Sequence, residues 1–430
     1  MAGLRPQYLG AVCLGFLLSA CQTTPQPTEG RSRPIVVQTE DGLTENTEDR
    51  VFAPQTETPD RSEPIYEERD RIVFDRSTIE SSPDTNFEVT FSDYLPGWDD
   101  ADFRATLISF SRNCSVWDKR DSDKVLMKTM PEFGQYKDWQ ILCAVMPSVP
   151  NDAETAKEFF ESYFLPANLL SNDKLEGLLT GYYEPEIEVR SRIDGEFSEP
   201  ILQRPEDDDL KNMSRADIYK NQIDYKVLAY GRPIDVFFMQ VQGSGRLRFK
   251  DGEIQRAAYG GHNGHKYKSI GSVLIRRREM TRDEASKQSI ENWMANAGSI
   301  ASRELMEENE RYIYFGLEEV DSDEGPKGSF TVPLTSMASM AIDPKARPYG
   351  VPVWLQTTLP QHSGDFVGSP QSLLVIAQDS GTAIKGKARG DLFFGSGDEA
   401  GELAGVMKHD VTMTHLLPRH LVLAELGVQK

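Results

Sequence analysis

Two aspartates lie around a glycine-rich connection near the C-terminal end of the chain. Asp379 and Asp391 belong to the segment AQDSGTAIKGKARGDLFFG at 377–395, and apolar runs at 373–377 and 392–394 flank the connection. This pattern predicts a strand, a tight connection and a second strand. A strand end can hold a buried carboxyl with a raised pKa, as proton donation to a glycosidic or acyl oxygen requires. Aspartates beside glycines are also common turn residues, so the segment alone leaves both roles open.

The rest of the chain supplies helical and β-rich stretches that must position these carboxyls. Helically spaced apolar residues predict helices at 101–114, 152–165, 272–278, 282–297 and 300–309. From Lys174 onward, short runs rich in β-branched and aromatic residues are broken by Gly and Pro. These runs predict strands, among them 178–189, 199–205 and 234–249.

The N-terminus has the pattern of a signal peptide. Arg5 precedes an apolar run at 8–18, which is too short to span a bilayer as a mature helix. The string LSAC resembles a bacterial lipobox, in which removal of residues 1–20 leaves Cys21 as the acylated N-terminus. Gln22 is not the aspartate that usually retains such lipoproteins in the inner membrane. The resemblance therefore implies a lipid anchor at the periplasmic face of the outer membrane; an ordinary secretory signal with an incidental cysteine is the alternative.

Cysteine usage agrees with export from the cytoplasm. Of the four cysteines, Cys13 leaves with the signal peptide and Cys21 would carry the lipid. Cys114 and Cys143 remain, and in an oxidising compartment they predict one disulfide. Two buried free thiols are the alternative.

The composition separates a tether from a folded part. Residues 22–86 are rich in Thr, Pro, Glu, Asp, Gln and Arg, which predicts a disordered tether with a reach of roughly 40 to 50 Å. The formal charge of −21 disfavours nucleic acid as a partner, because a negative chain does not attract phosphates. The remaining length predicts two domains.

Six motifs follow one another in the C-terminal half of the chain. They are GYYEP at 181–185, QVQGSGRL at 240–247, YGGHNGHKYKSIG at 259–271, MASMAIDP at 337–344, the segment 377–395 and EAGELAG at 399–405. In this order they resemble the membrane-bound lytic murein transglycosylase A family. The resemblance implies a mainly β fold with helices, in which a double-psi β-barrel domain carries an inserted, second β-barrel-like domain. The catalytic barrel domain would comprise 87–182 plus 326–430, and the substrate-binding insert 183–325, with a groove between them.

The same resemblance implies roles for three aspartates, Asp343, Asp379 and Asp391. By position, Asp391 is the general acid and then the general base, Asp379 holds the loop or tunes the pKa of Asp391, and Asp343 is structural. The implied reaction is lytic transglycosylation, which cleaves the β-1,4 bond between N-acetylmuramic acid and N-acetylglucosamine in peptidoglycan and leaves 1,6-anhydro ends. One acid suffices because the O6 hydroxyl of muramic acid attacks C1.

Two alternatives stay open at this point. A hydrolytic muramidase needs a second carboxylate, for which Glu184 and Asp379 are candidates. A non-catalytic peptidoglycan-binding lipoprotein would keep the groove without the chemistry.

Several side chains are suited to a sugar groove by their chemistry. Aromatic faces, neutral hydrogen-bonding groups, a carboxylate, a permissive glycine and one cation give the candidates Tyr182, Tyr183, Glu184, Gln240, Gln242, Gly243, Ser244 and Lys385. Ordinary core, bulge and surface roles are the alternatives. The histidines lack the spacing of a tetrahedral metal site, so neither a metal nor a cofactor is expected. Glycan strands of peptidoglycan and the outer membrane are the expected partners, and other cell-wall enzymes are further candidates.

Overall fold

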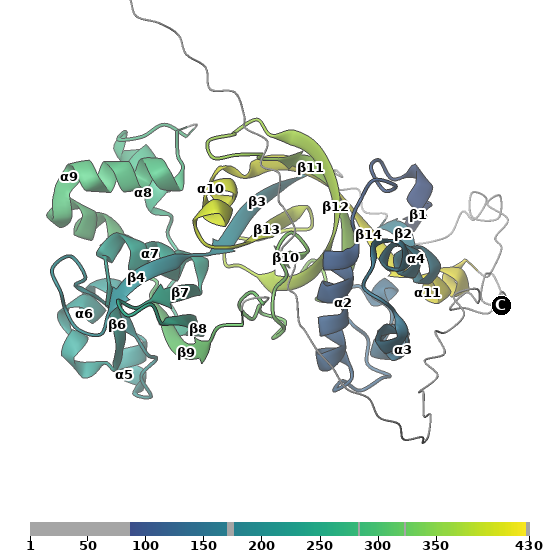
Figure 1. Cartoon of the computed structure of the whole chain (residues 1–430), viewed down its shortest axis with the longest axis horizontal. Helices are drawn as coiled ribbons and strands as arrows, with labels where there is room; N and C mark the ends of the chain where they lie inside the picture. The colour runs from purple at the N-terminus through teal and green to yellow at the C-terminus, as the bar shows by residue number, and fades with distance from the viewer. Residues whose placement is uncertain (1–86, 170–175, 283, 322–323, 427–430) are drawn as a thin grey trace, which may run out of the picture. The chain divides into compact units, whose positions relative to one another are not determined.

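Two β-sheets form the framework of the part of the chain that the structure describes. This computed structural model describes residues 87–169, 176–282, 284–321 and 324–426 (Figure 1). One sheet has eight strands and the other has six. The strands of the first sheet come from 87–184 and 339–418, and those of the second from 186–319.

The eight strands of the first sheet are β1 (Phe87–Val89), β2 (Phe164–Leu169), β3 (Glu176–Glu184), β10 (Ser339–Ile342), β11 (Pro352–Leu359), β12 (Ser369–Ser380), β13 (Arg389–Ser396) and β14 (Lys408–Pro418). Those of the second sheet are β4 (Glu186–Arg190), β5 (Glu199–Leu202), β6 (Val227–Gly231), β7 (Gly245–Arg248), β8 (Ile254–His262) and β9 (Ile313–Glu319). The helices are α2 (Arg104–Trp117), α3 (Tyr136–Val145), α4 (Ala153–Tyr163), α5 (Asp208–Lys211), α6 (Arg215–Lys220), α7 (Pro233–Gln242), α8 (Ile270–Arg277), α9 (Lys287–Glu307), α10 (Asp398–Val406) and α11 (Arg419–Glu425).

The first sheet closes on itself. Its strand order is β1-β2-β14-β11-β12-β10-β13-β3, and β14 also pairs with β3, so six strands form a barrel (Figure 1). The second sheet has the order β5-β6-β4-β7-β8-β9. The predicted fold class, mainly β with helices and built from a barrel and a second β-rich part, is confirmed.

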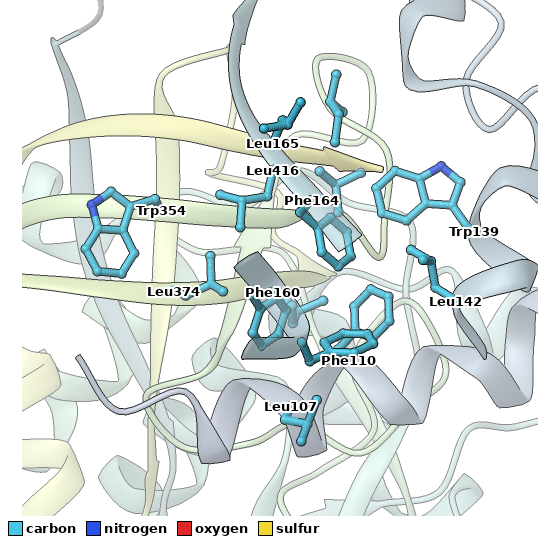
Figure 2. Packing of buried hydrophobic residues seen from close by; sticks show 14 of the residues in the cluster. Leu107, Phe110, Trp139, Leu142, Phe160, Phe164, Leu165, Trp354, Leu374 and Leu416 are labelled. Atoms are coloured by element: carbon cyan, nitrogen blue, oxygen red, sulfur yellow. The ribbon is translucent and has the colours of Figure 1, made fainter. Parts of the chain in front are cut away.

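An aromatic core packs helices against the barrel. Phe110 of α2, Trp139 of α3 and Phe160 of α4 belong to one buried cluster with Trp354 of β11 and Phe164 of β2 (Figure 2). Fully burying such a side chain contributes about 1.5 to 3 kcal/mol. Burial of this apolar surface therefore holds the helices on the sheet.

Two local features fix these helices further. The carboxylate of Asp152 accepts a hydrogen bond from the backbone N–H of Thr155 at 2.9 Å and so caps α4. Cys114 of α2 and Cys143 of α3 form a disulfide, which crosslinks the two helices. Such a crosslink stabilises a fold mainly by restricting the unfolded chain.

The sequence interpretation was wrong for 234–242. This segment, predicted as a strand, is helix α7, which begins with Pro233 and ends at Gly243 in the left-handed region with φ of 95°. Proline suits the first helical turn and glycine suits the position after the last. The helix is buried along Val236–Gln240, so its apolar run lacks the polar face that distinguishes an amphipathic helix from a buried strand.

The two helices predicted at 282–297 and 300–309 form one element, α9, that is broken at Gly298. Gly298 has φ of 83° and ψ of 172°, a conformation open to glycine and not to a helical residue with a side chain. Among the described residues, no helix has the length and apolar character needed to cross a membrane. The predicted signal peptide, lipidated Cys21 and tether lie outside the described residues.

Candidate active site

The barrel places the two aspartates of the opening motif in one row across neighbouring strands. Ala341 of β10 is the register partner of Asp379 on β12 and of Asp391 on β13. On the other side of β13, Asp391 pairs with Thr180 of β3. Register partners lie on the same face of a sheet, so these side chains share one face of the barrel wall. The connection at 381–388 thus passes over β10 instead of joining adjacent strands.

Asp391 is held by a short chain of hydrogen bonds. The Thr180 hydroxyl donates to Oδ1 of Asp391 at 2.5 Å, and Nη2 of Arg389 donates to the Thr180 oxygen at 2.7 Å. Burial raises the pKa of Asp391 to about 6, against the hydrogen bond from Thr180 and the charge of Arg389, and with a contribution from the negative charge of Asp379. A carboxyl with this pKa can donate a proton and later accept one near neutral pH.

Asp379 is a hydrogen-bond acceptor for the segment beside it. Its Oδ1 accepts from the backbone N–H and the hydroxyl of Ser329 and from the N–H of Ser380, each at 2.8 Å. Its Oδ2 accepts from the Tyr182 hydroxyl at 3.0 Å. Burial raises the pKa of Asp379, and these hydrogen bonds oppose the rise. Asp379 thereby positions Tyr182, whose ring centroid lies 5.3 Å from that of Phe393.

Asp343 connects the end of β10 to the connection between β12 and β13. Its carboxylate accepts from the backbone N–H of Gly386 at 2.9 Å and from that of Lys345 at 3.1 Å. The hydrogen bond from Gly386 is the main cause that lowers the pKa of Asp343. Such a carboxylate stays ionised and orders the connection that precedes Asp391.

A groove of about 970 Å³ runs along this face. Residues of the first sheet and its connections line one wall, among them Thr180, Tyr182, Asp379, Lys385 and Asp391. The opposite wall comes from the second sheet and its helices and includes Gln240, Gln242, Gly243, Ser244, Tyr259 and Arg311. Aromatic and neutral polar side chains of this kind suit the faces and hydroxyl groups of sugars.

Tyr183 and Glu184, also expected to contact substrate, do not belong to the lining of this groove. Glu184 is fully buried, and its carboxylate accepts from Nε of Arg246 at 2.9 Å and from Nε of Arg256 at 2.6 Å. Tyr183 is buried against Gly401 of α10, where a Cβ would lie 2.6 Å from its ring. Successive side chains of β3 point to opposite faces, which places Tyr182 at the groove and Tyr183 in the core.

The predicted polar candidates differ in how firmly they are held. Gln240 is buried, and its Oε1 accepts from Nη1 of Arg215 at 2.6 Å. Oε1 of Gln242 accepts from the backbone N–H of Tyr183 at 3.2 Å. Lys385 is exposed, and its Nζ lies 3.5 Å from the carbonyl oxygen of Gly381.

Thr180 and Arg389 are site residues that the sequence analysis did not find. Thr180 is 211 positions from Asp391 and meets it only through the parallel pairing of β3 with β13. The signals in the sequence were weak: Thr180 immediately precedes the GYYEP motif, and Arg389 is two positions before Asp391. In the described ranges, no group of three His, Cys, Asp or Glu side chains could hold a metal ion.

A carboxyl with a raised pKa at the wall of a groove lined by aromatic and polar side chains is the kind of site that acid–base enzymes use on sugar substrates. Comparison with known proteins identifies the family to which this chain belongs. Residues 178–316 match the MltA specific insert domain, and residues 338–417 match the 3D domain. The chain is 39% identical over 233 residues to membrane-bound lytic murein transglycosylase A of Escherichia coli K12, and the match spans 54% of this chain and 62% of that protein.

Solved structures agree with these matches. The lytic transglycosylase LtgG of Burkholderia pseudomallei is 34% identical with a TM-score of 0.55, and the match covers 79% of this chain and 97% of that chain. MltA of E. coli with bound chitohexaose is 28% identical with a TM-score of 0.57, covering 79% of this chain and 93% of that one. The chain belongs to the MltA family of lytic murein transglycosylases.

Proposed function

We propose that this protein is a peptidoglycan lytic transglycosylase that cleaves the β-1,4 bond between N-acetylmuramic acid and N-acetylglucosamine. Membership of the MltA family supports the proposal, as does the linear sugar chain, chitohexaose, held by the E. coli relative. The observation that carries it is the Asp391 carboxyl at the groove wall, with a pKa of about 6.

The reaction uses Asp391 twice. Protonated Asp391 gives its proton to the glycosidic oxygen as the C1–O bond breaks, and the leaving sugar departs as a free hydroxyl. The O6 hydroxyl of the muramyl residue attacks C1 and transfers its proton to the Asp391 carboxylate. The products are a 1,6-anhydromuramyl end and a new glycan end, no water is consumed, and Asp391 is protonated again.

The hydrolytic alternative needs a second carboxylate that activates water. Glu184 is buried between two arginines, away from the groove lining, and cannot supply one. Asp379 lines the groove, but its oxygens already accept four hydrogen bonds, from Ser329, Ser380 and Tyr182. Both arrangements favour the mechanism with a single acid.

For the cellular site, the proposal is a lipid anchor on Cys21 at the periplasmic face of the outer membrane. The LSAC motif and the membrane-bound relatives support it. The barrel part, at 87–182 plus 326–430, would supply catalysis, and the insert at 183–325 would bind glycan.

The mass of the products tests the proposed reaction. Digestion of purified murein should release muropeptides that are lighter by one water than those from a muramidase. Muropeptides of the hydrated mass would establish hydrolysis, and intact murein under the same conditions would establish a binding protein.

A further inference from the structure

The wall of the groove opposite Asp391 contains two arginines whose charges have no carboxylate partner among the described residues. Arg215 and Arg311 both line the groove. Arg215 is 1% exposed and donates to oxygens of Tyr219, Gln240, Asn309 and Arg311, all of them neutral acceptors. Its positive charge is therefore fixed beside the groove without being neutralised.

Arg311 differs from Arg215 because part of its guanidinium is available. Its Nη1 donates to the carbonyl oxygen of His265 at 3.1 Å, and the side chain is partly exposed at the groove. Burial lowers the pKa of Arg311, and the electrostatic interaction with Tyr259 opposes that effect. A partly desolvated cation of this kind gains more from an anionic ligand than a fully hydrated lysine does.

The acidic residues nearest in sequence already have partners. Glu310 lies 3.3 Å from Nδ1 of His265, and Glu318 lies 3.3 Å from Nζ of Lys327. Glu199, in the same part of the fold, pairs with Arg303 at 2.7 Å. No carboxylate of the described chain thus occupies the position beside Arg311, and an anion from the substrate can take it.

We propose that Arg311 binds a carboxylate carried by the muramyl residues of the glycan. This inference rests on the proposed function, which makes peptidoglycan the substrate. The alternating chain offers such groups on every second sugar, either as a free lactyl carboxylate or as carboxylates of the stem peptide. Arg215, fixed behind Gln240, adds to the positive potential of this wall. The subsite distinguishes peptidoglycan from a neutral chitin chain of the same length.

Binding measured by calorimetry in an Asp391→Asn background tests this subsite without any turnover. The probes are chitohexaose, a hexasaccharide of alternating N-acetylglucosamine and N-acetylmuramic acid with free lactyl carboxylates, and the same hexasaccharide carrying stem peptides. We expect at least one muramyl probe to bind about tenfold more tightly than chitohexaose. An advantage of the peptide-free probe identifies the lactyl group, and an advantage confined to the peptide-bearing probe identifies the stem. Equal affinities for all three probes overturn the proposal.

Four further variants separate charge recognition from loss of structure. Adding Arg311→Gln should remove the advantage of the muramyl probe, whereas Arg311→Lys, which keeps the charge, should retain part of it. Arg276→Gln is the matched control, because Arg276 is exposed on α8 and does not line the groove. If the advantage survives in Arg311→Gln, or disappears in Lys385→Gln instead, the assignment is wrong. Since binding is read without cleavage, failure here is distinct from failure of the proposed reaction.

Discussion

The two walls of the groove differ in the charged groups that they hold in buried or partly buried positions, which are two carboxyls on the barrel wall and two arginines on the opposite wall. On the barrel wall, Asp379 and Asp391 lie on the two strands that flank β10, and both pair in register with Ala341. Burial raises the pKa of both carboxyls. On the opposite wall, Arg215 and Arg311 donate only to neutral acceptors within the part of the chain that the structure describes. Uncompensated charges in partly buried places cost stability, so they mark the surfaces where a fold serves function.

The difference also separates two tasks. The barrel wall is built from hydrogen-bonded strands in fixed register, which suits a proton donor that must be placed within a fraction of an ångström. The opposite wall presents amides, an aromatic ring and cations, which suit recognition of a substituted sugar chain. We therefore expect substitutions on the barrel wall to change the rate of bond cleavage, and substitutions on the other wall to change affinity.

The largest effect is expected for Asp391→Asn. The amide can accept the hydrogen bond from Thr180 but cannot donate an acidic proton, so the cleavage rate should fall by roughly 1,000-fold or more. The affinity for glycan should change little, because the shape of the wall is kept. Release of anhydromuropeptides, quantified by mass spectrometry, and calorimetric binding measure the two quantities. Substantial cleavage by this variant would remove Asp391 from the mechanism.

A smaller effect, about tenfold on the rate, is expected for Thr180→Val. Loss of the hydroxyl removes a hydrogen bond that lowers the pKa of Asp391, so that pKa should rise. Because the acid must be protonated at the start, the alkaline limb of the pH profile of kcat/KM should move to higher pH. Thr180→Ser keeps the hydroxyl and should keep the wild-type profile. An unchanged profile in Thr180→Val would show that this hydrogen bond does not tune Asp391.

Asp379→Asn should shift the same profile in the opposite direction. The negative charge of Asp379 raises the pKa of Asp391, so neutralising it should move the alkaline limb to lower pH. The amide retains an acceptor for Ser329, and the rate at the optimum should fall only about fivefold. Steady-state kinetics over a pH series measures both quantities. A shift to higher pH would mean that Asp379 acts through geometry instead of charge.

The smallest effect is expected on the opposite wall, for Gln242→Ala. Loss of one neutral hydrogen-bonding group should raise KM about threefold and leave kcat nearly unchanged. Kinetics with defined glycan strands measures both. A fall in kcat with unchanged KM would contradict the division of tasks between the walls.

Much of the barrel could be predicted from the sequence, because its strands and motifs are local patterns. The apolar runs that flank the connection between Asp379 and Asp391 lie in β12 and β13, as predicted. Helices α2, at 104–117, and α4, at 153–163, lie close to their predicted positions. Helix α7 was missed because its buried central run, Val236–Gln240, lacks the alternation of apolar and polar faces on which periodicity depends. Pro233 and Gly243, at its two ends, were the available signals.

The site was less predictable, because its contacts depend on the order of strands in the barrel. Asp379 and Asp391 were found as a local pair, but their row with Ala341 and Thr180 arises from β10 and β3 lying on either side of β13. Glu184 follows Tyr182 by two positions, so alternation alone would place both on one face. Arg246 and the buried Arg256 hold the Glu184 carboxylate instead, and no local sequence pattern indicates that contact.

The protonation of Asp391 is the central claim, and isotope-edited infrared difference spectroscopy of the wild type against Asp391→Asn measures it directly. The carboxyl band assigned to Asp391 should titrate with a midpoint about pH 6, above the ordinary range of an aspartate. Such a midpoint means that the acid is available to protonate the glycosidic oxygen near neutral pH. A midpoint near pH 4, as for an exposed aspartate, would contradict the account.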